Sequence, residues 1–163
     1  MRNSISKNTP TSKQSNGQYN TPLELINTIF NLDDISNIEE YSFIEPSFGS
    51  GNILNYLNKK YPLNLKVGFE LDNQYRSVCD LYNTSDKFTT SIQNFYDVSS
   101  IDLKTKLIFL GNPPYRTPNE SSNTHPKVIS DLKKKYKIDA IKEEAVFFIL
   151  HTLDLCTDGD YIY

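Results

Sequence analysis

Short apolar runs alternate with segments of helical periodicity along most of this chain, and the alternation limits the folds open to it. The apolar runs predict strands at 41–45, 65–70 and 106–110, and a more polar segment at 87–92 predicts a further strand nearer an edge of the sheet. Ile53, Leu54 and Leu57 repeat at helical spacing after the first run, which predicts a helix there. Strands that alternate with helices predict an α/β fold with a mostly parallel, doubly wound sheet. Such sheets bind ligands beyond the carboxyl ends of their strands, where the strand order reverses.

Two more helices and a last strand complete the predicted elements. The segment Thr21-Pro22-Leu23-Glu24 has the form of a capping box, with proline at the first helical position. A helix over about 141–156 is expected to bury Ile141, Ala145, Phe148, Ile149 and Leu153. Because Tyr161-Ile162-Tyr163 begins a strand at the end of the chain, we expect the sheet to be incomplete. Residues 1–17, rich in Ser, Asn, Thr and Lys, are expected to form a flexible tail.

Charge and cysteine content argue against several classes of function. The net charge of −3 means that any contact with nucleic acid must come from a local patch or from a part of the protein outside this sequence. Cys79 and Cys156 lie far apart, which argues against a disulfide scaffold or zinc site and fits a reducing cytoplasm. His125 and His151 show no metal-ligand spacing, so both are interpreted as structural, and no metal is expected. No apolar run is long enough to span a membrane.

One basic segment stands out in this acidic chain. Between Arg116 and Lys137 there are six Lys or Arg residues and two acidic residues. The segment could contact phosphates. Val128, Leu132 and Tyr136 also give it an apolar stripe at helical spacing, so a solvated helix face is an equally good interpretation.

The segment Asn112-Pro113-Pro114-Tyr115 is the strongest functional signal. It follows an apolar strand directly, and its two prolines fix φ and remove two backbone donors, so the loop is stiff. The Asn112 amide oxygen and the Pro113 carbonyl could accept both hydrogens of a planar amino group. Tyr115 offers a face on which a base can stack. A turn that merely ends a strand is the alternative interpretation.

Acidic residues end the first two predicted strands. Glu45 precedes Gly49-Ser50-Gly51, a tight turn into a helix where glycine lets the backbone approach a ligand closely. Glu70 ends the second strand, where a carboxylate can accept from two ribose hydroxyls, as in dinucleotide folds. Asp72 is a competing acceptor.

Three segments in order resemble N6-adenine DNA methyltransferases. Residues 110–115 are similar to the catalytic Asn-Pro-Pro-Tyr motif of that family, and 44–54 to its cofactor motif, with Glu45, Pro46, Ser47, Gly49 and Gly51 at the matching positions. Residues 17–22 resemble the segment that precedes the cofactor motif in the gamma arrangement. The resemblance implies a Rossmann-like methyltransferase fold. It also implies that 18–163 is the N-terminal part of the catalytic domain, without a target-recognition domain and inactive alone.

S-adenosylmethionine is the cofactor that this resemblance implies. Glu45 would hold its ammonium, and the helix that starts at Thr21, beside Tyr19, would face its carboxylate. Glu70 would bind the ribose, and Leu71 would cover the adenine ring. Asn94-Phe95 stands where the family usually has Asp-Phe, so either Asn94 or Asp97 would accept from the cofactor's amino group, with Phe95 packed on the ring.

The implied partner is double-stranded DNA with its target adenine flipped into the pocket. Asn112 and Pro113 would accept from N6, Pro114 would stiffen the loop and Tyr115 would stack on the base. Transfer would then be direct. A restriction endonuclease would be a further partner. A protein-glutamine or RNA-guanine methyltransferase, or a non-catalytic piece, stays open as an alternative.

Overall fold

The computed structural model describes residues 21–30, 32–83, 85–115 and 125–163. Its strands are β1 (Tyr41–Glu45), β2 (Lys66–Glu70), β3 (Phe88–Ile92), β4 (Lys106–Phe109) and β5 (Tyr161–Ile162). Its α-helices are α2 (Leu23–Ile29), α3 (Asn52–Lys60), α4 (Arg76–Tyr82), α5 (Pro126–Tyr136) and α6 (Glu144–Leu155). Three single-turn helices are η1 (Ile38–Glu40), η2 (Asn73–Tyr75) and η3 (Phe95–Asp97).

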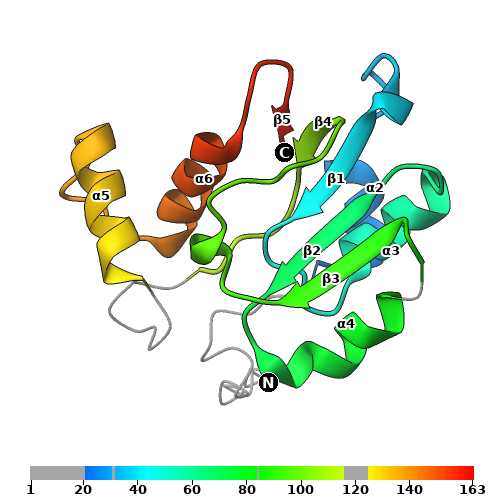
Figure 1. Cartoon of the computed structure of the whole chain (residues 1–163), viewed down its shortest axis with the longest axis horizontal. Coiled ribbons are helices and arrows are strands. Elements are labelled where there is room, and N and C mark those ends of the chain that lie inside the picture. The colour runs from blue at the N-terminus through cyan, green and yellow to red at the C-terminus, as the bar shows by residue number, and fades with distance from the viewer. Residues whose placement is uncertain (1–20, 31, 84, 116–124) are drawn as a thin grey trace, which may run out of the picture.

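The five strands form one parallel sheet in the order β3-β2-β1-β4-β5 (Figure 1). The chain moves outward from β1 to β3, then returns to pair β4 with the other side of β1. The strand order therefore reverses between β1 and β4, which is where a parallel sheet offers a crevice for ligands. The predicted α/β architecture is confirmed. The prediction that 87–92 lies near an edge is also confirmed within the described sheet.

Helices cover both faces of the sheet. Successive side chains of each strand point to opposite faces, so each face has its own apolar core under its helices. On one face, α2, α3 and α4 pack on Phe43 of β1 and Ile108 of β4. On the other face, α5 and α6 pack with Ile44, Phe69 and Phe109. The sheet is thus the middle layer of three.

The predicted start of the first helix is wrong in detail. Pro22 is the N-cap residue of α2 and makes no side-chain capping hydrogen bond, so the expected capping box does not form. The carbonyl of Thr21 instead accepts a hydrogen bond from Asn52 Nδ2 at 3.0 Å. Leu23 and Ile29 are exposed, whereas Ile26 and Phe30 are buried. Only a narrow face of this short helix is therefore buried.

The predicted buried face of α6 is also partly wrong. Ile149 and Leu153 are 45% and 46% exposed, while His151 and Thr152 are buried with Phe147 and Phe148. This helix is apolar nearly all round, so its sequence does not reveal which face the sheet covers. The structural role predicted for His151 is confirmed, since its Nε2 lies 3.1 Å from the Phe95 carbonyl in the core.

Some predictions lie outside the described residues. These are the flexible tail at 1–17, the placement of Tyr19 with its neighbours up to Asn20, and Arg116 in the basic segment. Among the helices that are described, none has the length and apolar character needed to cross a membrane.

Candidate ligand site at the strand ends

Four of the predicted site residues meet along one edge of the sheet. Glu45 and Glu70 end β1 and β2, and Asn94 and Asn112 follow β3 and β4. Because all five strands are parallel and paired in close register, these positions share the carboxyl edge. The strand arrowheads in Figure 1 point toward that edge.

The Glu70 carboxylate anchors the glycine turn. Its Oε2 accepts from the Gly49 amide at 2.7 Å, and its Oε1 accepts from the Asp72 amide at 2.7 Å. The Phe48 amide donates to the Phe69 carbonyl at 2.8 Å, so the turn is tied to β2 twice. Burial raises the pKa of Glu70, and these backbone donors oppose the rise.

Asp72, the competing acceptor, has a local role. Its carboxylate accepts from the Gln74 amide at 2.9 Å and caps η2. The two acids therefore differ in setting: Glu70 is 7% exposed and lies against the glycine turn, while Asp72 stands at the start of the next helical turn.

Glu45 is a buried carboxylate at the end of the central strand. It is 2% exposed, and its Oε2 accepts from the Leu54 amide at 3.3 Å, in the first turn of α3. Burial raises its pKa well above the ordinary value, and the nearby Glu70 adds to the rise. An ionised carboxylate here is costly unless a positive group joins it.

Close packing explains the glycines near this turn. Gly51 has φ +77°, and a Cβ there would lie 2.6 Å from Phe48 Cζ. A Cβ on Gly68, in β2, would lie 2.8 Å from Phe48 Cδ2. The Phe48 ring thus occupies the space that both glycines leave and fixes the path of the turn.

The loop after β4 is tied to the loop after β1. Ser47 Oγ donates to the backbone carbonyl of Asn112 at 2.9 Å. Asn112, Pro113 and Pro114 are half-buried, and Tyr115 is 58% exposed. The resemblance placed Ser47 among the cofactor residues. The structure shows that its hydroxyl contacts the Asn-Pro-Pro-Tyr segment, and the cofactor role of Ser47 stays a prediction.

A small apolar hollow of about 40 Å³ lies beside this junction. Pro46, Ser47 and Pro113 form one wall, and Phe148, Ile149 and Thr152 of α6 form another, with Ile162 and Tyr163 beyond β5. No local sequence pattern places α6 and β5 at the site, because only the strand order brings them beside β4.

The segment after β3 is held by contacts from both helices of its face. Asn94 Oδ1 accepts from the Tyr96 amide at 3.1 Å, and Asp97 Oδ1 lies 3.0 Å from His125 Nε2. The Phe95 ring is buried against Phe148, with centroids 5.0 Å apart. The structure thus gives Asn94, Phe95 and Asp97 structural contacts, and the choice between Asn94 and Asp97 stays open.

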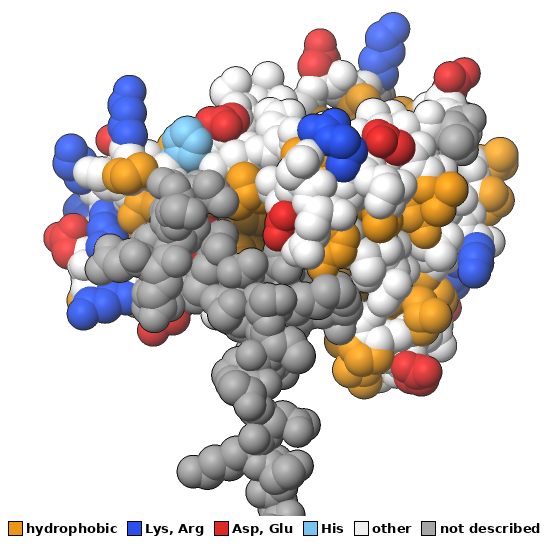
Figure 2. All heavy atoms as spheres, turned by 90° about the horizontal axis from the view of Figure 1, so that it is seen from below, with side chains coloured by type: hydrophobic (Ala, Val, Ile, Leu, Met, Phe, Trp, Pro, Cys, Tyr) orange, Lys and Arg blue, Asp and Glu red, His pale blue; other side chains and the backbone are white. Residues whose placement is uncertain are grey.

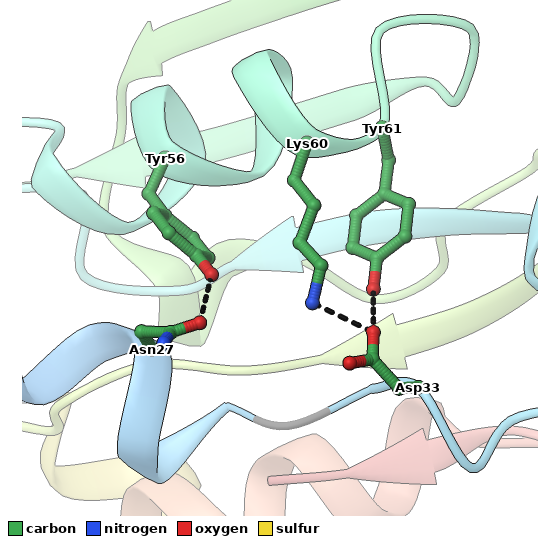
Figure 3. A network of polar contacts seen from close by, with 5 residues as sticks. All are labelled: Asn27, Asp33, Tyr56, Lys60 and Tyr61. Carbon is green, nitrogen blue, oxygen red and sulfur yellow. Dashed lines mark hydrogen bonds and ion pairs between the residues drawn. The ribbon is translucent and has the colours of Figure 1, made fainter.

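Polar contacts fasten α2 to α3 on the other face of the sheet (Figure 3). Tyr56 donates to Asn27, and Asp33 accepts from Lys60 at 2.7 Å and from Tyr61 at 3.1 Å. These bonds set α2 beside the helix that follows the glycine turn.

Leu71, which directly follows Glu70, is half-buried. Within the described part of the chain, no cluster of His, Cys, Asp and Glu side chains could hold a metal ion.

No protein-family model and no curated protein matches the chain. Among solved structures, a candidate class I S-adenosylmethionine-dependent methyltransferase from Listeria monocytogenes superposes with TM-score 0.60 at 15% identity, over 96% of this chain and 47% of that one. The chain therefore spans about half the length of that protein. The similarity establishes the Rossmann-like fold of that structure.

Two other solved structures align less closely. A candidate RNA methyltransferase from Pyrococcus horikoshii has TM-score 0.45 at 19% identity, over 77% of this chain and 61% of that one. The plantazolicin methyltransferase BpumL, in complex with a pentazolic desmethyl analogue and SAH, has TM-score 0.37 at 11% identity, over 82% and 64%.

Proposed function

We propose that this chain binds S-adenosylmethionine and belongs to an enzyme that methylates N6 of adenine in double-stranded DNA. One observation carries the proposal. The buried acid that ends β1 and the rigid Asn112-Pro113-Pro114 loop after β4 lie side by side at the reversal of strand order, joined through Ser47. The fold shared with a class I methyltransferase structure supports the reaction class.

The first two strand ends suit the proposed cofactor. Glu45 is buried with a raised pKa, and the ammonium of a methionine moiety would supply the missing positive charge. Glu70 already orders the glycine turn through one oxygen, and carboxylate oxygens have further lone pairs for ribose hydroxyls. Gly49 and Gly51 both have positive φ, which lets the chain turn tightly between Glu45 and the first turn of α3. When bound, the cofactor would supply an electrophilic methyl group.

The fourth strand end suits a planar amino group as acceptor of that methyl. Asn112 Oδ1 and the Pro113 carbonyl would each accept one N–H, which orients the nitrogen lone pair toward the methyl donor. Tyr115 would stack on the flipped base from its exposed position. Cys79 is buried and Cys156 half-buried, and this burial raises the pKa of both thiols, which does not favour a thiolate nucleophile. Direct transfer to nitrogen needs none.

Two other acceptors present the same planar amino chemistry: a glutamine amide of a protein and the amino group of guanine in RNA. The sequence of the Tyr19 to Pro22 segment, which resembles the gamma arrangement, favours DNA. The same resemblance is the reason for proposing a restriction endonuclease as a further partner.

Two measurements test the proposal. Calorimetry of the chain with S-adenosylmethionine should detect binding that Glu45→Ala weakens, while Glu39→Ala, an exposed acid on η1, should leave it unchanged. Transfer of labelled methyl should then be assayed in parallel on duplex DNA, RNA and protein, with the chain alone and in any longer protein that contains it. Label on adenine N6 supports the proposal. Label on protein or RNA alone would contradict the DNA assignment, and no loss of affinity in Glu45→Ala would contradict the cofactor site.

A further inference from the structure

The surface around α5 carries positive charge in a chain that is acidic overall. Residues 125–142 include six lysines and two aspartates, while the whole chain has a net charge of −3. Lys127, Lys134 and Lys137 are exposed. Figure 2, which looks at the molecule from below, shows Lys and Arg side chains gathered at its left edge, the side on which α5 lies in Figure 1. The charge is therefore concentrated on one side.

Not all of these lysines are available to a partner. Lys135 Nζ lies 2.6 Å from Asp154 Oδ1, and Lys133 Nζ lies 5.5 Å from the centre of the Phe147 ring. Lys127, Lys134 and Lys137 have no acidic or aromatic contact among the residues that the structure describes. The charges of these three lysines are therefore not paired with an acidic side chain in the described part of the chain.

Helix α5 is packed on the core and begins next to the site. Ile129 and Leu132 are buried against the α6 side of the core. His125, the N-cap residue of α5, lies 3.0 Å from Asp97 of η3, which follows the carboxyl end of β3. The first turn of α5 therefore sits at the ligand edge of the sheet, and the helix leads away from it.

We propose that Lys127, Lys134 and Lys137 bind backbone phosphates of the DNA duplex whose target base enters the site. This inference rests on the proposed function. At about 1.5 Å per residue, the ten residues from Lys127 to Lys137 span about 15 Å. That length covers roughly four base steps at about 3.4 Å each along one strand. The helix can thus follow the strand beside the flipped base.

The chemistry of the surface favours phosphate over bases. Lysine is a compact point charge that binds phosphate without reading sequence. The exposed positions of α5 include no aromatic ring, because Tyr136 is half-buried and its hydroxyl donates to Asp154. A platform for single-stranded RNA would need such rings for stacking.

The test is the salt dependence of duplex binding. Fluorescence anisotropy should be measured from low to moderate salt for the parent and for the triple variant Lys127→Gln, Lys134→Gln and Lys137→Gln. Each phosphate contact contributes about 0.9 to the slope of log affinity against log salt. The triple variant should therefore lose about 2 to 3 from the slope magnitude and bind at least tenfold more weakly at low salt.

Matched control variants distinguish the loss of phosphate contacts from a loss of stability of α5. Lys135→Gln removes a charge from the same last turn, but one already paired with Asp154. Lys59→Gln removes an exposed lysine from the last turn of α3 on the opposite face. Both should keep the parent slope. Far-ultraviolet circular dichroism and thermal melting should show the triple variant folded, and Lys→Arg at the three positions should restore the slope.

The outcomes are distinct from those that test the proposed function. An unchanged slope in the folded triple variant overturns the inference even if the parent methylates DNA. A lysine-dependent affinity for RNA or an acidic peptide that exceeds the affinity for duplex DNA also overturns it. A reduced slope supports the surface, and S-adenosylmethionine affinity, which these lysines should not affect, reports separately on the cofactor site.

Discussion

Ser47 Oγ donates a hydrogen bond to the backbone carbonyl of Asn112 across the reversal of strand order, at 2.9 Å. The bond joins the loop that follows Glu45 to the loop that carries the proposed amino-group acceptors. The Asn112 carbonyl belongs to the peptide that precedes Pro113, so the bond fixes the plane from which both Asn112 and Pro113 project. Ser47 is therefore interpreted as a positioning residue for the methyl acceptor.

Ser47→Ala should slow transfer without weakening cofactor binding. Loss of one hydrogen bond of this kind typically costs about 1 kcal/mol, so we expect roughly a fivefold to tenfold fall in the single-turnover rate. Ser42→Ala is the matched control, because Ser42 Oγ bonds Thr105 Oγ1 at 2.6 Å near the opposite end of β1. That variant should lose comparable stability but keep its rate. Equal rates for Ser47→Ala and Ser42→Ala would contradict the positioning role.

Glu45→Gln should change the pH dependence of stability. The pKa of Glu45 is raised in the folded protein, so between the ordinary value of 4.5 and the raised value the native state holds a proton that the unfolded chain has released. Its contribution to stability is therefore present at low pH and lost as pH rises. Glutamine does not ionise, so the variant should gain stability relative to the parent from pH 4 to pH 8. Urea unfolding at pH 4 and pH 8 measures the free energy of unfolding of both proteins. The same difference between variant and parent at both pH values would contradict the prediction.

The same carboxyl group predicts proton release on cofactor binding. An ammonium beside Glu45 favours the ionised form, so its pKa should fall when S-adenosylmethionine binds. Calorimetry in buffers of different ionisation enthalpy should show the parent releasing protons as pH falls into the range of the raised pKa. Glu45→Gln should release fewer. Equal release by both proteins would assign the proton to another group, with Glu70 the first to examine.

Gly68→Ala should destabilise the fold by overpacking. The new Cβ would meet Phe48 Cδ2 at 2.8 Å and Thr90 Cγ2 at 3.2 Å, and such crowding costs about 1–3 kcal/mol. Gly111→Ala is the control, because its Cβ would find its nearest neighbour, Pro46 Cδ, at an ordinary 3.7 Å. Thermal melting should separate the two by several degrees. Phe48→Leu combined with Gly68→Ala should recover part of the loss if the Phe48 ring is the cause.

Local sequence patterns predicted most of the fold but little of how the site is joined. Strands β1 to β4 fall within the predicted segments. The central strand β1 is apolar because both faces of the sheet are covered there, whereas β3 at the edge is more polar and partly exposed. The face of α6 was mispredicted, since a helix with Phe147, Phe148 and Ile149 in succession carries no phase signal. The Ser47–Asn112 and His125–Asp97 contacts join residues far apart in the chain, which only tertiary structure brings together.

Substitutions at Asn112 and Tyr115 separate catalysis from binding. Asn112 follows β4, whereas the residues proposed to hold the cofactor follow β1 and β2, so Asn112→Ala should abolish turnover while S-adenosylmethionine affinity stays near the parent value. Removing a well-placed hydrogen-bond partner of the transition state typically costs two to three orders of magnitude in rate, by analogy with an oxyanion-hole donor. Tyr115→Ala should weaken use of the flipped base by roughly 1–3 kcal/mol, whereas Tyr115→Phe should be mild because a phenyl ring still stacks. The expected order of rates is therefore Asn112→Ala lowest, Tyr115→Ala intermediate and Tyr115→Phe near the parent. Single-turnover transfer to a duplex that contains the target site measures this order. Near-parent turnover by Asn112→Ala would reduce Asn112-Pro113-Pro114-Tyr115 to a rigid turn that ends β4.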